Sequence, residues 1–465
     1  MRVSVYKVFL VLGDIAIFFF ALAAALAIRR PALFSPHYYL EHVVFFSFVL
    51  PVYLGVNGIL GLYDFRQIRD LPGIIGESLL AFLYTFTASV FIYYFSGTFF
   101  ASPKTYLFLT LLITLIAGIY WRRLWMSIIA TPMFATKTLF LGNNEIIGQL
   151  MDDLQSHRYN RFKVVKREAV LGWGGVAGGK SLRDMADLIV VDQEQIGTDP
   201  ANQQVLSAAV DNAVPVWTYT DFYEELHKKV APFTTNKNAW MLEHVLHRRN
   251  TFYIWIKNFN GFLLAGLGVI LLSPLLPLIA LAIKLEDGGP VFYSQPRVGY
   301  LKRTFRLWKF RTMKVGADSA GYLWNTAQAD PRVTRVGKLL RKFRVDELPQ
   351  FWNVLTGEMA LVGPRPTWVG EKQAWDLPDY HMRTLVKPGL TGWAQINSSA
   401  TDSEDDTFEK LCYDLYYIKN LSFALDLSIL LKTVRRVFQS EQSLRRKRQA
   451  ARKPPSAPSE LQPVK

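Results

Sequence analysis

Two adjacent carboxylates, Asp346 and Glu347 in the segment RVDELPQ, are the residues best suited to chemistry. Pro349 follows them, and proline is favoured in the first turn of a helix. One interpretation is structural, with Asp346 as the N-cap and Glu347 as the first helical residue. The other is phosphoryl transfer, in which one carboxylate is the nucleophile and the other holds Mg²⁺, while the helix N-terminus keeps both ionised. The two residues alone leave both interpretations open.

Cationic side chains recur around this pair, among aromatic residues and Gly-Pro turns. The planar fork of arginine matches paired phosphate oxygens, which favours a diphosphate ligand over a single charge. Nucleic acid is the rival partner, and we do not expect it, because the carboxylates would repel a polyphosphate unless a metal intervened. The cations are Arg297, Lys309, Arg311, Arg332, Arg335, Arg341, Arg344 and Arg365.

The apolar segment ILLSPLLPLIALAIKL, residues 270–285, contains Pro274 and Pro277. Proline inside a helix costs about 3 kcal/mol, so their presence calls for a reason. Residues 258–285 could form a fifth span, a buried soluble helix, or a helix that bends at Ser273-Pro274 and leaves on the side it entered. Basic residues on both flanks favour this re-entrant hairpin, because a through-going span usually shows charge asymmetry. The Ser273 hydroxyl could satisfy a carbonyl freed by the bend, while a kinked span remains the alternative.

The composition places the chain near a membrane. Of its 465 residues, 50% are hydrophobic, which is too apolar for an ordinary soluble enzyme. The net charge of +15 calls for an anionic partner, which could be nucleic acid, anionic lipid or a phosphorylated substrate. The single cysteine, Cys412, excludes an intramolecular disulfide and a cysteine-rich zinc site.

Four apolar segments of about membrane length lie in the first 125 residues, at 8–28, 43–63, 74–96 and 105–120. They predict a four-helix transmembrane bundle over residues 1–125. A signal peptide is disfavoured for the first segment by its length, by Asp14 and by the spans that follow. Asp14 could be functional, or it could be bonded to a partner within the bundle.

The basic residues around these segments predict an orientation. More of them lie on the side that holds both ends of the bundle, so the positive-inside rule places both ends in the cytoplasm. The residues counted on that side are Arg2, Lys7, Arg66, Arg69, Arg122 and Arg123, against Arg29, Arg30 and Lys104 on the other.

Residues 137–245 predict a Rossmann-like α/β domain. A strand at 138–141 leads through a turn at 142–144 into a helix, and residues 187–192 and 214–220 resemble further buried parallel strands. Gly142 lacks the companions of a G-x-G-x-x-G loop, so we expect a non-catalytic scaffold or regulatory domain rather than a dinucleotide site. The glycine-rich residues 171–180 lack P-loop spacing and are interpreted as a flexible connection.

The tail, residues 441–465, has no apolar face and is predicted to be disordered. Its basic cluster, residues 445–448, could bind anionic lipid headgroups or remain solvated.

Residues 257–438 resemble the bacterial sugar transferase family, the monotopic polyprenyl-phosphate phosphoglycosyl transferases. The resemblance implies a membrane protein with a four-helix transmembrane bundle, a Rossmann-like α/β middle domain, and a re-entrant membrane hairpin plus a mainly helical α/β catalytic domain over residues 257–440. This architecture is similar to the large members that start exopolysaccharide, capsule or O-antigen repeat units. The motifs, in order, are SPLLPLIALAIKLEDGGPVFYSQPRVG, KFRTM, DPRVTRVG, VDELPQFWNVLTGEMALVGPRP, KPGLTGWAQIN and YDLYYIKNLSFALDLSILLKT.

The resemblance also implies an activity. Family members transfer a sugar-1-phosphate from a UDP-sugar to undecaprenyl phosphate and release UMP, at the cytoplasmic face of the bacterial inner membrane. Asp346 would attack the sugar-linked phosphate to form an aspartyl phosphosugar, and Glu347 would hold Mg²⁺. Ser273 and Pro274 match the re-entrant break. The expected phosphate-binding residues are Lys309, Arg341 and Arg365, which match family positions, together with Arg297 and Arg311.

The chain departs from the family pattern at two places. Arg344 stands where many small members carry serine, and it could contact a phosphate or face the acidic loop at 402–406. The segment GWAQINSSATDSEDD, residues 392–406, replaces the commoner continuation, so the resemblance does not name the hexose.

Two other functions were weighed. One is a non-catalytic membrane scaffold for a polysaccharide assembly complex, against which the intact Asp-Glu pair argues. The other is a polytopic nucleotide-sugar dehydratase, which would need a glycine fingerprint and an acid/base set that residues 137–245 do not display convincingly. The protein could form a homo-oligomer under any of these three functions.

Overall fold

The computed structural model describes most of the chain, which divides into two compact units, Met1–Pro232 and Phe233–Lys465. The first unit contains the apolar helices and a parallel sheet, and the second contains the carboxylate pair. The described residues are 2–63, 71–95, 104–129, 135–156, 162–165, 182–193, 195–196, 199–231, 251–317, 332–371, 375–377, 379–398 and 404–438.

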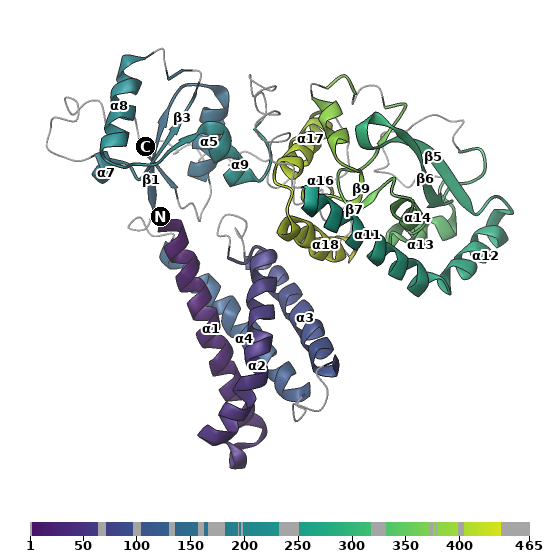
Figure 1. The fold of residues 1–465 in the computed structure, drawn as a ribbon, viewed down its shortest axis with the longest axis horizontal. Coiled ribbons are helices and arrows are strands. Elements are labelled where there is room, and N and C mark those ends of the chain that lie inside the picture. Colours follow the sequence, from purple (N-terminus) through teal and green to yellow (C-terminus); the bar gives the residue numbers. More distant parts are fainter. Residues whose placement is uncertain are drawn as a thin grey trace, which may run out of the picture. The chain divides into compact units, whose positions relative to one another are not determined.

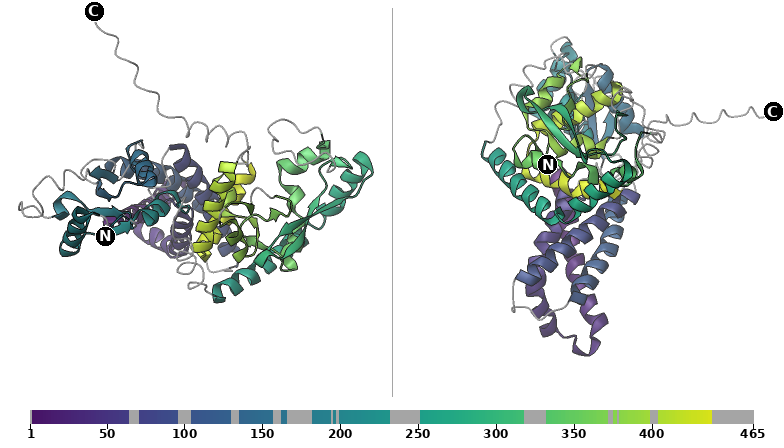
Figure 2. Two further views of the ribbon diagram at one scale, coloured as in Figure 1. Left: turned by 90° about the horizontal axis from the view of Figure 1, so that it is seen from above. Right: turned by 90° about the vertical axis from the view of Figure 1, so that its right-hand side faces the viewer.

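Four long helices form a bundle in which they run side by side (Figures 1 and 2). Phe18, Phe46 and Leu111 pack in its centre, whereas Phe20 and Phe48 point outward and are 70% and 60% exposed. Apolar side chains on the outside are expected where lipid is the solvent. The helices confirm a membrane protein with a helical N-terminal region. They are α1 (Arg2–Arg29), α2 (Pro36–Ile59), α3 (Leu71–Phe95) and α4 (Lys104–Ile129).

A buried ion pair joins the first and last helices of the bundle, α1 and α4. Arg122 donates to Asp14 at 2.6 Å, and Tyr63 donates to the same oxygen at 2.9 Å. Helix α4 continues to Ile129, so Arg122 lies within the helix, 2% exposed, and is not a loop charge. Counting it for the orientation was therefore wrong. The pair supports the interpretation of Asp14 as a partner-bonded residue of the bundle.

A four-stranded parallel sheet with the order β2-β1-β3-β4 follows the bundle in the chain. Successive residues of β1 and β3 point to opposite faces, so Leu139 packs in one core and Phe140 in the other. The edge strand β4 is exposed at Val216 and Trp217, so the expectation that it is buried was wrong. The elements are β1 (Thr136–Leu141), α5 (Glu145–Ser156), β2 (Phe162–Val165), α7 (Leu182–Met185), β3 (Leu188–Val191), α8 (Pro200–Asp211), β4 (Val216–Thr218) and α9 (Tyr219–His227).

The loop after β1 is occupied by the chain's own side chains. Asn144 accepts a hydrogen bond from the amide of Ile147 at 2.7 Å and donates to Asp192 at 2.8 Å, and the Asn143 amide donates to Gln195 at 2.9 Å. A pyrophosphate would need such amides at the helix N-terminus. Whether the domain binds a dinucleotide is not tested by these contacts, so its non-catalytic role stays a prediction. Residues 171–180 and 441–465 lie outside the described residues.

The second unit is a mixed α/β domain, as expected. A long antiparallel hairpin, β5 and β6, pairs with β8, and β7 pairs in parallel with β9. Its helices are α11 (Thr251–Leu272), α12 (Leu275–Asp287), α13 (Arg335–Lys342), α14 (Gln350–Leu355), α16 (Trp393–Asn397), α17 (Glu404–Lys419) and α18 (Phe423–Phe438). Its strands and short 3₁₀ turns are β5 (Phe292–Val298), η4 (Tyr300–Lys302), β6 (Thr304–Phe310), η6 (Val345–Glu347), β7 (Ala360–Val362), β8 (Thr367–Trp368), η7 (Tyr380–Leu385) and β9 (Gly389–Thr391).

The helix break falls at Ser273-Pro274, where α11 ends and α12 begins (Figure 1). The Ser273 hydroxyl donates to the carbonyl of Ile270 at 2.7 Å, the local bond expected for this serine. Pro274 stands at the N-cap of α12 and Pro277 in its first turn, where amides lack intrahelical partners in any case. Neither proline therefore removes a hydrogen bond from the interior of a helix.

Both arms of this broken helix pack against the same domain. Ala265 of α11 contacts a core that includes Val354 and Met359, and Ile279 and Ile283 of α12 contact Phe310 and Leu340. Among the described residues, α11 is also long and apolar enough to cross a membrane.

Candidate active site

The carboxylate pair lies in a tight turn between two helices. Helix α13 ends after Lys342, and Arg344 adopts a left-handed conformation with φ 53° and ψ 24°. The chain then forms the 3₁₀ turn η6 and enters α14 at Gln350, with Pro349 at the N-cap. The structural interpretation, in which Asp346 caps the helix and Glu347 begins it, was therefore wrong. The left-handed residue turns both carboxylates toward β6 instead.

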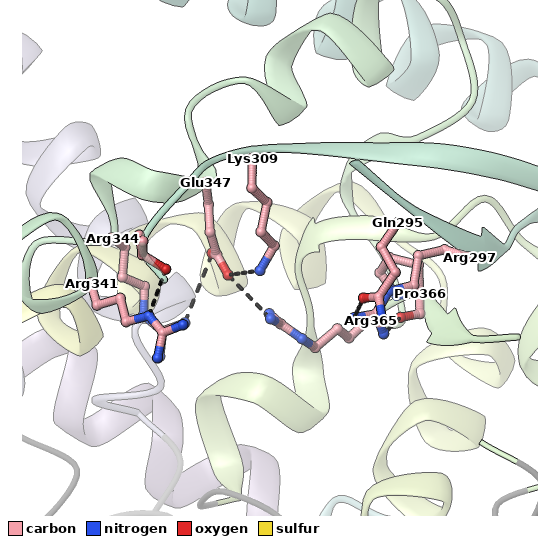
Figure 3. Close-up of polar contacts among 9 residues, drawn as sticks. Gln295, Arg297, Lys309, Arg341, Arg344, Glu347, Arg365 and Pro366 are labelled. Atoms are coloured by element: carbon pink, nitrogen blue, oxygen red, sulfur yellow. Dashed lines mark hydrogen bonds and ion pairs between the residues drawn. The ribbon is translucent and has the colours of Figure 1, made fainter. Parts of the chain in front are cut away.

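Three cations surround Glu347 (Figure 3). Arg365 donates to it at 3.1 Å, Lys309 lies 3.5 Å away, and Arg344 lies 3.8 Å from its other oxygen. Burial alone would raise the pKa of this carboxyl, but Arg365, Lys309 and Arg344 together lower it to about 2. Glu347 is thus a permanent anion at neutral pH. Arg344 contacts Glu347 from the adjoining turn. Of the acidic loop, residues 402 and 403 lie outside the described part, and residues 404–406 begin helix α17.

Asp346 has a different environment although it is the next residue. It is 9% exposed, and no hydrogen bond to its carboxylate occurs within the described chain. Burial raises its pKa above the ordinary value, and the negative Glu347 raises it further, against the opposing effect of Lys309, Arg341 and Arg344. A buried carboxylate with unoccupied lone pairs is poorly stabilised, and such a group is a better nucleophile than a bonded one.

Lys309 and Arg341 approach the carboxylate pair from two different elements, strand β6 and helix α13. Lys309 is held near the open end of the hairpin by the pairing of β6 with β5, opposite Tyr293. Burial lowers its pKa, and the charge of Glu347 opposes that shift. Arg341, near the end of α13, donates through Nε to Thr312 at 2.9 Å. The guanidinium of Arg341 is close enough to lower the pKa of Asp346.

The remaining two predicted phosphate ligands lie at the margin or away from the pair. Arg297 donates to Gln295 at 2.7 Å and to the carbonyl of Pro366 at 3.2 Å, near Arg365 (Figure 3). Arg311 is buried and forms an ion pair with Asp287 at the end of α12. That contact favours a role for Arg311 in joining α12 to the hairpin, and its phosphate-binding role stays a prediction.

The sequence interpretation missed a layer behind Arg365. Arg383 donates to the carbonyl of Arg365 at 2.9 Å and to the buried Asp414 at 2.8 Å. Burial, together with the positive charge of Arg365, lowers the pKa of Lys410 to about 8, despite the opposing charges of Asp406 and Asp414. Asp414 belongs to the motif YDLYYIK, which was quoted for the family but not assigned a site residue. Arg383 is therefore a positioning residue for Arg365.

The carboxylates of the site can be considered as ligands for Mg²⁺. Among the described residues, no group of three or more His, Cys, Asp or Glu side chains could hold a metal by itself. Mg²⁺ in phosphoryl-transfer sites commonly takes only one or two carboxylates and obtains its other ligands from phosphates and water. Asp346 and Glu347 fit that kind of site, although Glu347 shares its oxygens with three cations in this structure.

The site consists of two carboxylates surrounded by cations, on a domain that carries an apolar helix pair. This combination is typical of a membrane-associated protein that binds phosphorylated ligands. A family model described as bacterial sugar transferase matches residues 252–440. The sugar transferase EpsL of Bacillus subtilis is 44% identical over 186 residues, which cover 39% of this chain and 83% of that protein. The chain therefore belongs to the bacterial sugar transferase family.

Two longer relatives carry more specific names. One, from Aeromonas hydrophila, is a UDP-N-acetylgalactosamine-undecaprenyl-phosphate N-acetylgalactosaminephosphotransferase, 45% identical over 40% of this chain. Another, from Escherichia coli K12, is a UDP-glucose:undecaprenyl-phosphate glucose-1-phosphate transferase, 43% identical over 39% of this chain. The chain matches 44% and 40% of their lengths, so less than half of each relative is covered.

Proposed function

We propose that this protein is a phosphoglycosyl transferase that moves a sugar-1-phosphate from a UDP-sugar to undecaprenyl phosphate and releases UMP. The observation that carries the proposal is the contrast within the carboxylate pair. Asp346 is buried, accepts no hydrogen bond from the described residues and is weakly stabilised as an anion, whereas Glu347 is fixed by Arg365, Lys309 and Arg344. The first step of a double displacement needs a carboxylate whose oxygens are available to attack, and cations close by to neutralise the phosphate.

In the first displacement, a carboxylate oxygen of Asp346 forms a bond to the phosphorus that carries the sugar. The bond from that phosphorus to the bridging oxygen breaks, and UMP leaves with the electron pair. In the second displacement, a phosphate oxygen of undecaprenyl phosphate bonds to the same phosphorus, and the bond to Asp346 breaks. The product keeps one phosphoanhydride, so the exchange needs positioning and charge neutralisation more than an energy source.

Arg365, Arg344 and Arg341 supply the charge neutralisation in this proposal. Arg365 and Arg344 are 44% and 41% exposed at their side chains, so each has access to a ligand from solvent. A guanidinium binds two phosphate oxygens at once, which orients a diphosphate for in-line attack. Mg²⁺, held by Glu347, would supply further neutralisation of the diphosphate when bound.

The bent pair α11–α12 would place this chemistry at the membrane surface. Because both arms pack on one domain, the hairpin enters and leaves the lipid on the same side in this proposal. The catalytic domain then stays at the cytoplasmic face of the bacterial inner membrane, where a lipid phosphate and a nucleotide sugar can meet. The scaffold alternative does not account for a buried Asp346 that accepts no hydrogen bond from the described part of the chain and lies beside a fixed Glu347.

The first test is nucleotide release by the purified full chain with Mg²⁺ and separate UDP-sugars. UDP-glucose, UDP-galactose and their N-acetylated forms cover the donors named for the two relatives and their epimers. We expect UMP with at least one donor, and a phosphosugar adduct on the intact protein seen by mass spectrometry when no lipid acceptor is present. UMP release from none of the four donors would contradict the proposed activity with these donors.

Asp346→Asn tests the nucleophile. We expect it to remove the adduct and to lower UMP release by about 10³-fold or more, since the attacking group is lost. Asp376→Asn is the matched control, because Asp376 is an exposed aspartate of the same domain. An adduct that still forms on the Asp346→Asn protein would assign the nucleophile to another residue.

Glu347→Gln should weaken the dependence of UMP release on Mg²⁺. An unchanged Mg²⁺ titration would remove the metal-binding role from Glu347.

A further inference from the structure

A pocket of about 250 Å³ lies between α11 and the loop that follows α14. Its walls are mostly apolar and include the rings of Trp255, Phe259 and Phe262 on α11. Trp255 and Phe259 stack with their centroids 5.6 Å apart. Gly357, with φ 77°, ends α14 and opens the other wall, where a Cβ would lie only 3.6 Å from the ammonium of Lys387.

Two polar side chains enter this apolar pocket, Asn258 from α11 and Lys387 from the segment before β9. Within the described part of the chain, neither makes a hydrogen bond or an ion pair. Lys387 is half-buried, and this burial lowers its pKa. A half-buried cation and a half-buried amide without partners are costly unless a ligand pairs with them.

The pocket lies beside the aromatic part of α11, which has the composition expected at a membrane–water interface. Helix α11 is apolar, and the face that does not pack on the domain is exposed, with Ile270 and Leu271 69% and 68% exposed. Its aromatic residues gather toward the other end, around the pocket. Aromatic side chains concentrate at the level of lipid headgroups, so a ligand there has a polar head and an apolar chain.

The pocket is distinct from the catalytic cluster. Asp346 and Glu347 precede α14, whereas Val354, Leu355 and Gly357 of the pocket stand at its far end. A helix of 6 residues is about 9 Å long, and none of the cations around Glu347 lines the pocket. A phosphate on Lys387 is therefore not in place to receive a group from Asp346.

We propose that this pocket binds one anionic glycerophospholipid of the membrane, with its phosphate on Lys387 and Asn258 and an acyl chain along Trp255, Phe259 and Phe262. The lipid would hold α11 at a fixed depth against the catalytic domain. The inference depends on the membrane location of α11 and not on the reaction proposed above.

The test is native mass spectrometry of the full chain, purified in detergent after incubation with equal amounts of phosphatidylglycerol and phosphatidylcholine. We expect the unmodified protein to retain one phosphatidylglycerol in preference to phosphatidylcholine. Lys387→Met keeps the apolar stem and removes the charge, and it should lower that retention about fivefold, the change expected for one lysine beside anionic headgroups. Lys302→Met, an exposed lysine of the same domain, should retain the lipid.

Trp255→Ala provides a second variant, because it shortens the acyl-chain wall at an exposed ring and keeps Lys387. It should lower retention of the lipid as well. Equal retention of phosphatidylglycerol by the Lys387→Met and unmodified proteins would overturn the proposal. Displacement of the phosphatidylglycerol by a polyisoprenyl monophosphate would also overturn it, because the pocket would then belong to the acceptor. UMP release is scored separately, so a failure of the proposed reaction leaves this result readable.

Discussion

Two of the buried aspartates, Asp14 and Asp346, each have an arginine nearby but are stabilised in opposite ways. Asp14 in the helix bundle is fully buried, and one of its oxygens accepts hydrogen bonds from Arg122 at 2.6 Å and Tyr63 at 2.9 Å. Asp346 in the second unit is 9% exposed and accepts no hydrogen bond from the described residues. The nearest strong donors are directed to Glu347 instead.

This difference separates an aspartate that holds a fold from one prepared to react. A direct ion pair in a low-dielectric interior stabilises the anion and lowers its reactivity, while its loss leaves an unpaired charge behind. An aspartate that senses its cations only at longer range keeps its lone pairs available. The second environment costs stability, and a binding or catalytic function is the usual reason for such a cost.

The largest expected effect comes from breaking the pair in the bundle. Arg122→Met leaves Asp14 uncompensated and should destabilise the bundle by about 3–5 kcal/mol. Unfolding in mixed micelles with rising SDS would measure this, with Arg123→Met, an exposed neighbour, as the control. Adding Asp14→Leu to Arg122→Met should restore much of the loss. Equal SDS midpoints for the Arg122→Met and Arg123→Met proteins would show that the pair is not important for stability.

The second effect concerns the pH dependence of Asp346. Its attack requires the carboxylate form, so activity falls as the pH drops through its raised pKa. Lys309 is the charge that most strongly lowers this pKa, so Lys309→Met should move the acid limb of kcat/KM to higher pH. It should also lower UMP release by about 10–100-fold. A pH profile checks this, and an acid limb at the same pH as in the unmodified protein would contradict it.

The third effect is on protein stability, which should change in opposite directions when Asp346 and Glu347 are replaced by their amides. A raised pKa in the folded state means that ionised Asp346 destabilises the fold, so Asp346→Asn should add about 0.5–2 kcal/mol at pH 7 and nothing at pH values below the ordinary pKa. Glu347 has its pKa lowered to about 2 and stabilises the fold above its ordinary pKa. Glu347→Gln should therefore destabilise at pH 7, and this loss should shrink as the pH falls toward 2.

Thermal melts of both variants at neutral and acidic pH would measure these effects. If the two substitutions shift the melting temperature in the same direction at pH 7, the contrast between the two carboxylates is wrong.

The smallest effect tests the sheet domain of the first unit. Asn144→Ala removes the cap of α5 and the contact to Asp192, and it should cost about 1 kcal/mol. UMP release should not change, because we expect this domain to be non-catalytic. Gln149→Ala, on the exposed side of α5, is the control in the same thermal melt. Loss of UMP release at unchanged stability would give the sheet domain a catalytic role.

Much of the architecture was predictable from local patterns. Apolar segments of membrane length predicted helices where α1 to α4 occur, although α4 extends to Ile129, beyond the end of the predicted segment at residue 120. The dipeptide Ser273-Pro274 predicted the helix break, since proline restricts its own backbone and that of the preceding residue. The four-span topology, the domain boundaries and a homo-oligomer stay predictions.

The active site was only partly predictable. The composition of the segment around Asp346-Glu347 predicted a carboxylate pair among cations. It did not predict that Arg344 contacts Glu347. That contact depends on the left-handed backbone conformation of Arg344, which arginine seldom adopts. The composition also did not reveal Arg383, whose bonds to Arg365 and Asp414 join residues far apart in the chain.

The sequence by itself determined the membrane character, the family and the identity of the charged residues, because these follow from composition and ordered motifs. Only the tertiary structure decided which cation meets which carboxylate. Arg122 pairs with an aspartate 108 residues away, Arg311 turns to Asp287, and Asp346 is left without a hydrogen bond among the described residues. Pairing of charges depends on distances in the folded chain, and sequence spacing constrains those distances only within a helical turn or a strand.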